Sequence, residues 1–201
     1  MLQYADHTSL VTSLPIVEEV LDTHAAELGK DLIAYRNHVY RVVNLCLAIV
    51  GDGRVDLEKI AVAAVFHDLG IWTNHTFDYI APSVAIARAH LAARGMADWI
   101  PEIEAIVADH HKVTSARSDP HPSTTARGAL SEVEGPSLVE SFRRADWIDV
   151  TRGLRRFGVP RTFVAAVAAT WPSAGFHRRV VELTMGRWWK HPLNPLPMVK
   201  W

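Results

Sequence analysis

Cysteine is nearly absent from this chain, and the formal charge is close to zero. Cys46 is the single cysteine among 201 residues, so no disulfide can form within the chain and a reducing compartment such as the cytoplasm fits. The net charge of -1 at pH 7 gives no global attraction to nucleic acid or to an anionic membrane. Any nucleotide partner is therefore expected to be a small molecule.

Long hydrophobic runs are missing as well. The longest, Val42 to Val50, is interrupted by Asn44 and is far shorter than the roughly 20 apolar residues that span a bilayer. The N-terminus shows no basic region followed by an apolar stretch, as a secretion signal would. Two common catalytic motifs, a glycine-rich phosphate loop and His-Glu-x-x-His, are absent from the sequence as well. We expect a cytoplasmic protein without membrane contact.

Apolar residues recur at helical spacing almost everywhere, and no alternating strand pattern competes with them. A chain of 201 residues with 49% hydrophobic content can bury one substantial core. We therefore predict a single all-α domain over residues 1–201, an orthogonal bundle of about seven helices. The helices are expected at 15–28, 32–50, 57–69 with Asp56 as N-cap and Gly70 as the C-terminal stop, 83–93, 98–110, 137–151, 160–169 and 177–188.

Two segments break the helical pattern. Between residues 112 and 136 Ser, Thr, Pro and Gly dominate, and this is longer than loops in compact domains usually are. A lid, a disordered segment and a partner-binding loop all stay open. The Pro- and Trp-rich tail at 189–201 cannot be regular helix. It is available to wrap the body or to meet a second subunit, which leaves a homo-oligomer open.

The pair His67-Asp68 lies where an apolar helix is expected to end. A buried ionised aspartate costs roughly several kcal/mol unless something positive compensates it, and a divalent cation is the strongest compensator. A salt bridge to an arginine is the alternative. His38 and Asp146 are further candidate ligands, although a lone histidine such as His38 is more often a hydrogen-bonded core residue.

Three segments together resemble the HD-domain metal-dependent phosphohydrolases, which have a histidine, then a His-Asp pair, then a distant aspartate. Residues 35–42 around His38 resemble the first histidine helix, 66–70 the paired motif, and 144–149 the segment of the closing aspartate. The match spans most of the chain. It implies an HD-type helical domain with a metal-dependent hydrolase centre.

By this resemblance one divalent metal ion is bound by four side chains: His38, His67, Asp68 and Asp146. Two neutral imidazoles and two carboxylates cancel a 2+ charge and leave two coordination positions open. Mixed nitrogen and oxygen ligands suit manganese, iron, cobalt or nickel, with zinc as a further option. Water in one open position becomes acidic enough to supply hydroxide, and a phosphate oxygen in the other is polarised. The predicted reaction is hydrolysis of a phosphate ester of a small molecule, such as a nucleotide.

Some branches of this family hold two metals, with a further histidine at the start of the next helix and a His-His pair after the following one. Here His110-His111 provides the pair, but Ser83 stands where the earlier histidine is expected. His90, seven residues on, lies about 10 Å further along the helix axis and cannot replace it. We therefore expect one metal and keep His110 as a residue that contacts the metal or the substrate.

The remaining candidates are assigned by proximity in the sequence. His75 and Asp78 follow the His-Asp pair and are candidates to protonate the leaving oxygen, although Asp78 can instead cap a turn and His75 can be solvated. Lys112 and Arg144 are expected to bind an anionic substrate, with a solvated helix face as the ordinary alternative. Two other functions stay open: a hydratase or lyase of the cyanamide hydratase type, and a non-catalytic ligand-sensing module.

Overall fold

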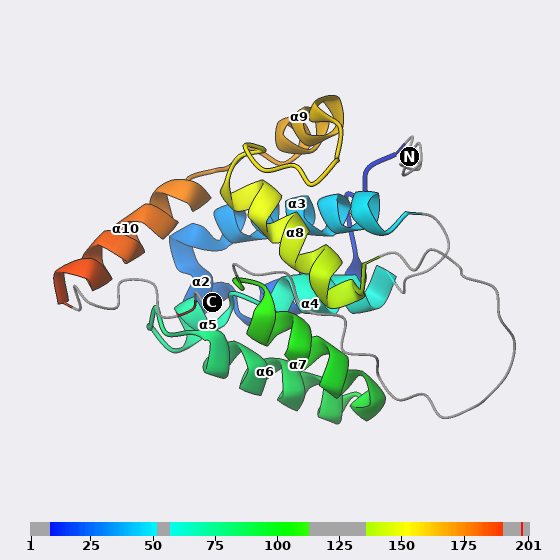
Figure 1. Ribbon diagram of the computed structural model, residues 1–201. Coiled ribbons are helices and arrows are strands. Elements are labelled where there is room, and N and C mark those ends of the chain that lie inside the picture. Colours follow the sequence, from blue (N-terminus) through cyan, green and yellow to red (C-terminus); the bar gives the residue numbers. More distant parts are fainter. Residues whose placement is uncertain (1–8, 52–56, 113–135, 191–197, 199–201) are drawn as a thin grey trace, which may run out of the picture.

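The computed structural model describes residues 9–51, 57–112, 136–190 and 198, and no strand occurs in these ranges. The predicted all-α fold is confirmed. Figure 1 shows the helices, which are α1 (Pro15–Thr23), α2 (Ala25–Leu28), α3 (Leu32–Val50), α4 (Leu57–Phe66), α5 (Gly70–Thr73), α6 (Ile80–Ala93), α7 (Ile100–Asp109), α8 (Leu138–Val150), α9 (Arg161–Thr170) and α10 (Phe176–Lys190), with short 3-10 turns at Gly29–Asp31 and Ala97–Trp99.

The longest helix, α3, lies at the centre and packs along α8 on one side and α4 on another (Figure 1). Its residues Val39, Val42, Val43 and Cys46 recur at helical spacing and are fully buried. Every residue of α4 from 60 to 66 is buried too. Because these central helices are covered on most sides, polar residues within them need partners inside the protein.

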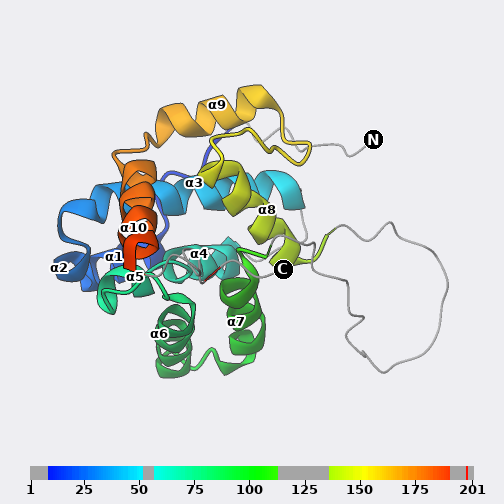
Figure 2. The same ribbon diagram turned by 60° about the vertical axis from the view of Figure 1, so that its left-hand side comes forward.

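The helix ends follow the local signals. Ser137 caps α8 by accepting a hydrogen bond from the Glu140 backbone N–H at 3.3 Å, and Pro101 lies in the first turn of α7. Gly95, after α6, adopts a φ of +72°, which favours glycine. α6 and α7 then pack side by side below α4 (Figure 2). This pairing brings the end of α7 close to α4.

One predicted boundary is wrong and matters for the site: α4 ends at Phe66, not Leu69, and Gly70 starts α5 instead of stopping a helix. The chain tightens here, with bonds from the Leu69 N–H to the Phe66 carbonyl and from the Ile71 N–H to the Asp68 carbonyl. A Cβ on Gly70 would lie 2.6 Å from the Tyr79 carbonyl oxygen. Position 70 therefore requires glycine, because the backbone at Tyr79 and Ser83 approaches it closely. His67 and Asp68 lie in the turn between α4 and α5.

Other differences are smaller. The expected helix 15–28 is interrupted at His24, α6 begins three residues early with Pro82 in its first turn, and α10 continues to residue 190, two beyond its expected end. Asp56, the loop 113–135 and most of the tail lie outside the described residues. In the described part of the chain no helix combines the length and apolar content that crossing a membrane requires. One domain over 1–201 stays a prediction.

Candidate metal centre

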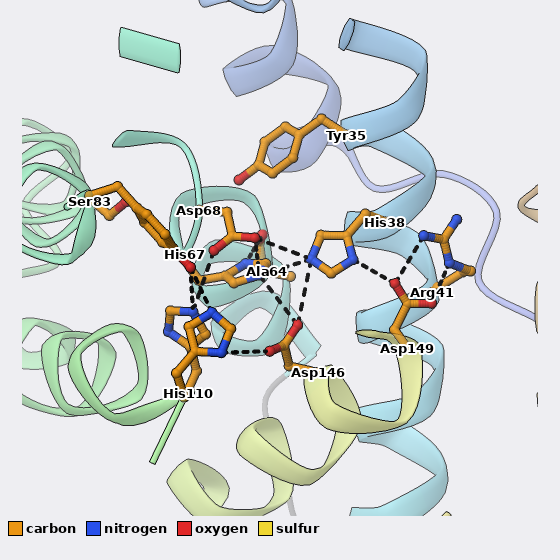
Figure 3. A network of polar contacts seen from close by, with 12 residues as sticks. Tyr35, His38, Arg41, Ala64, His67, Asp68, Ser83, His110, Asp146 and Asp149 are labelled. Atoms are coloured by element: carbon orange, nitrogen blue, oxygen red, sulfur yellow. Dashed lines mark hydrogen bonds and ion pairs between the residues drawn. The ribbon is translucent and has the colours of Figure 1, made fainter. Parts of the chain in front are cut away.

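Three elements bring the four predicted metal ligands together (Figure 3). His38 comes from α3, His67 and Asp68 from the turn after α4, and Asp146 from α8. The His38 Nε2 lies 3.0 Å from the His67 Nε2. It lies 3.6 Å from Asp68 Oδ2 and 3.6 Å from Asp146 Oδ1. All four side chains are buried, so their donor atoms face one another in place of water.

Hydrogen bonds on the far side of each ring orient the histidines. The Nδ1 of His38 lies 2.7 Å from Asp149 Oδ2, that of His67 lies 2.8 Å from the Ala64 carbonyl oxygen, and that of His110 lies 2.7 Å from the Val107 carbonyl oxygen. Each Nε2 therefore faces the cluster. Because the acceptors require a proton on Nδ1, the Nε2 of a neutral ring carries the lone pair that can bind a metal. Histidines that bind a metal through one ring nitrogen typically donate a hydrogen bond from the other ring nitrogen.

Three of the four carboxylate oxygens of Asp68 and Asp146 lack hydrogen-bond partners within the described chain. Both oxygens of Asp146 and Oδ1 of Asp68 are buried and accept no hydrogen bond, a costly arrangement for anionic atoms. A divalent cation would satisfy these oxygens and would also accept the lone pairs of the two Nε2 atoms. The residues present therefore fit a divalent metal ion.

The charges of the metal-free cluster are strongly perturbed. Burial alone lowers the pKa of His67, but the carboxylates of Asp68 and Asp146 outweigh it and raise this pKa to about 9. Burial dominates at His38, where the Asp149 carboxylate offsets it only in part, and the pKa falls to about 4. Burial and the neighbouring carboxylates raise the pKa of Asp146 well above its usual range. In the absence of metal, a proton on His67 partly replaces the cation.

A second group shares Asp68 with the first. The donor atoms of Asp68, His110 and His111 lie within 4.8 Å of one another. The His110 Nε2 is 3.4 Å from Asp68 Oδ1, whereas Asp68 Oδ2 faces His38 and His67. The Tyr79 hydroxyl lies 2.6 Å from the His111 Nε2. The structure thus brings His110 into the cluster together with His111, the second member of the His-His pair. It also brings in Tyr79, to which the sequence gave no role.

Ser83 is not a ligand in this arrangement. Its side chain is fully buried, and its Oγ accepts a hydrogen bond from the Gly70 backbone N–H at 3.0 Å. In Figure 3 it lies to the side of the cluster. Ser83 therefore joins α6 to the turn that holds His67 and Asp68. The expectation of a single cation stays a prediction.

Sequence reasoning missed the residues that support His38. Asp149, which accepts from the His38 ring, also pairs with Arg41, at 2.5 Å from Nε and 2.9 Å from the second guanidinium nitrogen. The Phe176 ring stacks on the His38 ring, with centroids 3.9 Å apart and an angle of 11° between the planes. A signal for the pair existed: His38 and Arg41, and Asp146 and Asp149, are each three residues apart on facing helices.

The other predicted residues lie elsewhere or are already paired. His75 and Asp78 are exposed; His75 lines a different cavity, near α2 and α10, so the structure does not bring these two into the cluster. The Lys112 ammonium pairs with Asp109 at 2.7 Å. The Arg144 Nε donates to Glu140 at 2.7 Å. Their assignments as catalytic and substrate-binding residues stay predictions.

This all-helical fold gathers imidazoles and carboxylates from remote helices into groups that could hold a metal ion. The model of the HD domain family matches residues 35–151, a range that includes all four predicted ligands, and the chain therefore belongs to the HD domain family. Members of this family are generally metal-dependent hydrolases. Comparison with curated proteins and with solved structures gave no match.

Proposed function

We propose that this protein is a metal-dependent phosphohydrolase that cleaves a phosphate ester of a small molecule, with nucleotides as the first class to test. The observation that supports it most directly is the set of unsatisfied carboxylate oxygens on Asp68 and Asp146 beside the inward-facing Nε2 atoms of His38 and His67. These four residues would hold the cation. A bound divalent cation supplies acidified water and polarises a phosphate oxygen.

The chain's own residues divide the remaining tasks. Asp149 and the Ala64 carbonyl fix the rings of His38 and His67, so that the ligand nitrogens need no reorganisation. His110 lies against Asp68 Oδ1, where it would contact the cation or the substrate.

Lys112 and Arg144 would attract the phosphate group. Lys112 is paired with the partly exposed Asp109, and exposed pairs are worth only about 0.2–1 kcal/mol, so a doubly charged phosphate can compete for its ammonium group. Arg144 is partly exposed but pairs with the buried Glu140, which also holds Arg143, so its guanidinium would contact the phosphate without leaving that carboxylate. Arg144→Gln is expected to raise KM or lower kcat for phosphorylated substrates, and unchanged kinetics would remove Arg144 from the site.

The experiment is a phosphate-release screen on purified protein loaded in turn with manganese, cobalt or nickel, using nucleotides and sugar phosphates. Asp146→Asn should reduce the rate by at least about 100-fold, because it removes a ligand charge from the cation. Asp98→Asn, the same change at an exposed residue, should leave the rate unchanged.

Metal-loaded wild type that releases no phosphate from any compound would refute the proposal. If the metal-loaded wild type released no phosphate but hydrated small nitriles, the hydratase reaction would replace the phosphohydrolase proposal.

A further inference from the structure

A second cavity, distinct from the metal cluster, lies between α3, α8 and α9. Residues of the segment 151–160, which joins α8 to α9 (Figures 1 and 2), also line it. Its volume is about 610 Å³, within the range of small-molecule sites. Apolar side chains form much of its lining: Leu45, Ile148, Val164, Val167, Ala168 and Trp171.

The rim of this cavity has three unneutralised positive charges. Arg152, Arg156 and Arg161 all line it. Within the described ranges no carboxylate forms an ion pair with any of them. The only carboxylate in the lining is that of Asp149, which is already paired with Arg41. The cavity therefore combines an apolar interior with a cationic rim, which favours an anion attached to an apolar body.

The backbone that presents these arginines is held in place. After α8 the Arg152 N–H bonds to the Asp149 carbonyl at 2.9 Å and the Gly153 N–H to the Ile148 carbonyl at 2.8 Å. Arg152 itself has a φ of +52°, a conformation that costs a non-glycine residue roughly 1–2 kcal/mol. Strain of this kind persists where surrounding structure enforces it and is enriched at ligand sites.

The cavity is suited to binding and not to metal chemistry. His177 and Asp149 are its only residues of a metal-binding type. The His177 Nε2 donates to the Asp149 carbonyl at 2.9 Å, and its Nδ1 lies 2.8 Å from the Ser173 hydroxyl. The Asp149 carboxylate is occupied by Arg41 and His38. Asp149 thus lies between the cavity and the metal cluster.

We propose that this cavity binds a small organic anion whose carboxylate, sulfonate or phosphate head group contacts Arg152, Arg156 and Arg161. The apolar part of the ligand packs against Trp171 and Val167. The site does not depend on the hydrolase activity, because none of these residues belongs to the metal cluster.

The test uses 2-naphthalenesulfonate, which has a permanent charge, an aromatic body and little affinity for metals. Binding to the metal-free 201-residue protein is measured by titration calorimetry. The triple variant Arg152→Gln, Arg156→Gln and Arg161→Gln is expected to bind at least about tenfold more weakly, since the head group loses its cations. Ala168→Trp places a bulky side chain at a lining residue without changing the charge and is expected to weaken binding as well.

A matched control separates the effect of losing the three cavity arginines from the effect of lowering the net charge of the protein. Arg88→Gln, Arg94→Gln and Arg178→Gln remove the same charge from other exposed surfaces and should leave binding within about twofold of wild type. Circular dichroism verifies that all variants are folded. The proposal is overturned if wild type does not bind the sulfonate, if both triple variants lose binding equally, or if neutral 2-naphthalenemethanol binds as tightly as the sulfonate.

Discussion

The replacement Asp149→Asn tests how the metal cluster is built. Asp149 contacts no predicted cation site directly; its carboxylate accepts from the His38 Nδ1 and pairs with Arg41. Asparagine keeps the size of the side chain but removes its charge. Arg41, which is only 3% exposed, then lacks a neutralising partner, and the His38 ring loses its charged acceptor.

Two effects of different size follow from these contacts. Removing one partner of a buried ion pair costs about 3–5 kcal/mol, a large share of a typical folding free energy of about 5–15 kcal/mol. Loss of the residue that orients a metal-binding histidine lowers metal affinity by about 10–100-fold. The variant should therefore be less stable and should also bind metal more weakly.

The assays measure the two effects separately. Urea unfolding of metal-free protein gives the stability change, and titration with manganese at a temperature where the variant is folded gives the affinity. Replacing both partners, as in Arg41→Met with Asp149→Leu, should restore much of the stability but not the metal affinity. Wild-type metal affinity in Asp149→Asn would refute the positioning role. Asp98→Asn serves as the exposed control.

Three further predictions concern protons, packing and the aromatic support. The pKa of His67 is raised to about 9 in the metal-free protein, so a cation must displace the proton of His67 at neutral pH. The apparent metal affinity should therefore rise with pH up to about 9. Calorimetry at pH 7 in buffers of different ionisation enthalpy should detect the release of at least about one proton on metal binding. No proton release would contradict this charge assignment. Gly70→Ala forces a Cβ against backbone atoms of Tyr79 and Ser83 and should destabilise by about 1–3 kcal/mol in urea unfolding, whereas Gly186→Ala, with open space around it, should be neutral or stabilising; equal effects would refute the packing argument. Phe176→Ala removes the ring stacked on His38 and should cost about 3–5 kcal/mol, and an unchanged unfolding midpoint would show that this contact is unimportant.

Much of the helical layout could be predicted from apolar spacing, and α3 was predicted to the residue. The end of α4 could not, because the stop depends on the close approach of Gly70 to α6, which lies at a distance in the sequence. A glycine after an apolar helix has two explanations, a C-terminal cap or a tight contact. Only the tertiary structure separates them.

The site divides in the same way. The four ligand candidates were found from motif order, and the structure brings them together, although their binding of metal stays a prediction. Tyr79 was not found, because a tyrosine in a polar stretch gives no local sign that its hydroxyl reaches His111, which lies in the turn after α7. His75 and Asp78 were chosen for sequence proximity, and the tight turn after Asp68 carries that segment outward to exposed positions.

The most direct test is the metal content of the purified protein after equilibration with manganese, cobalt or nickel and removal of free ion. We expect at least one bound divalent cation per chain in wild type and loss of that cation in Asp68→Asn and Asp146→Asn. Correctly folded wild type that holds no divalent metal, or variants that hold as much as wild type, would contradict it.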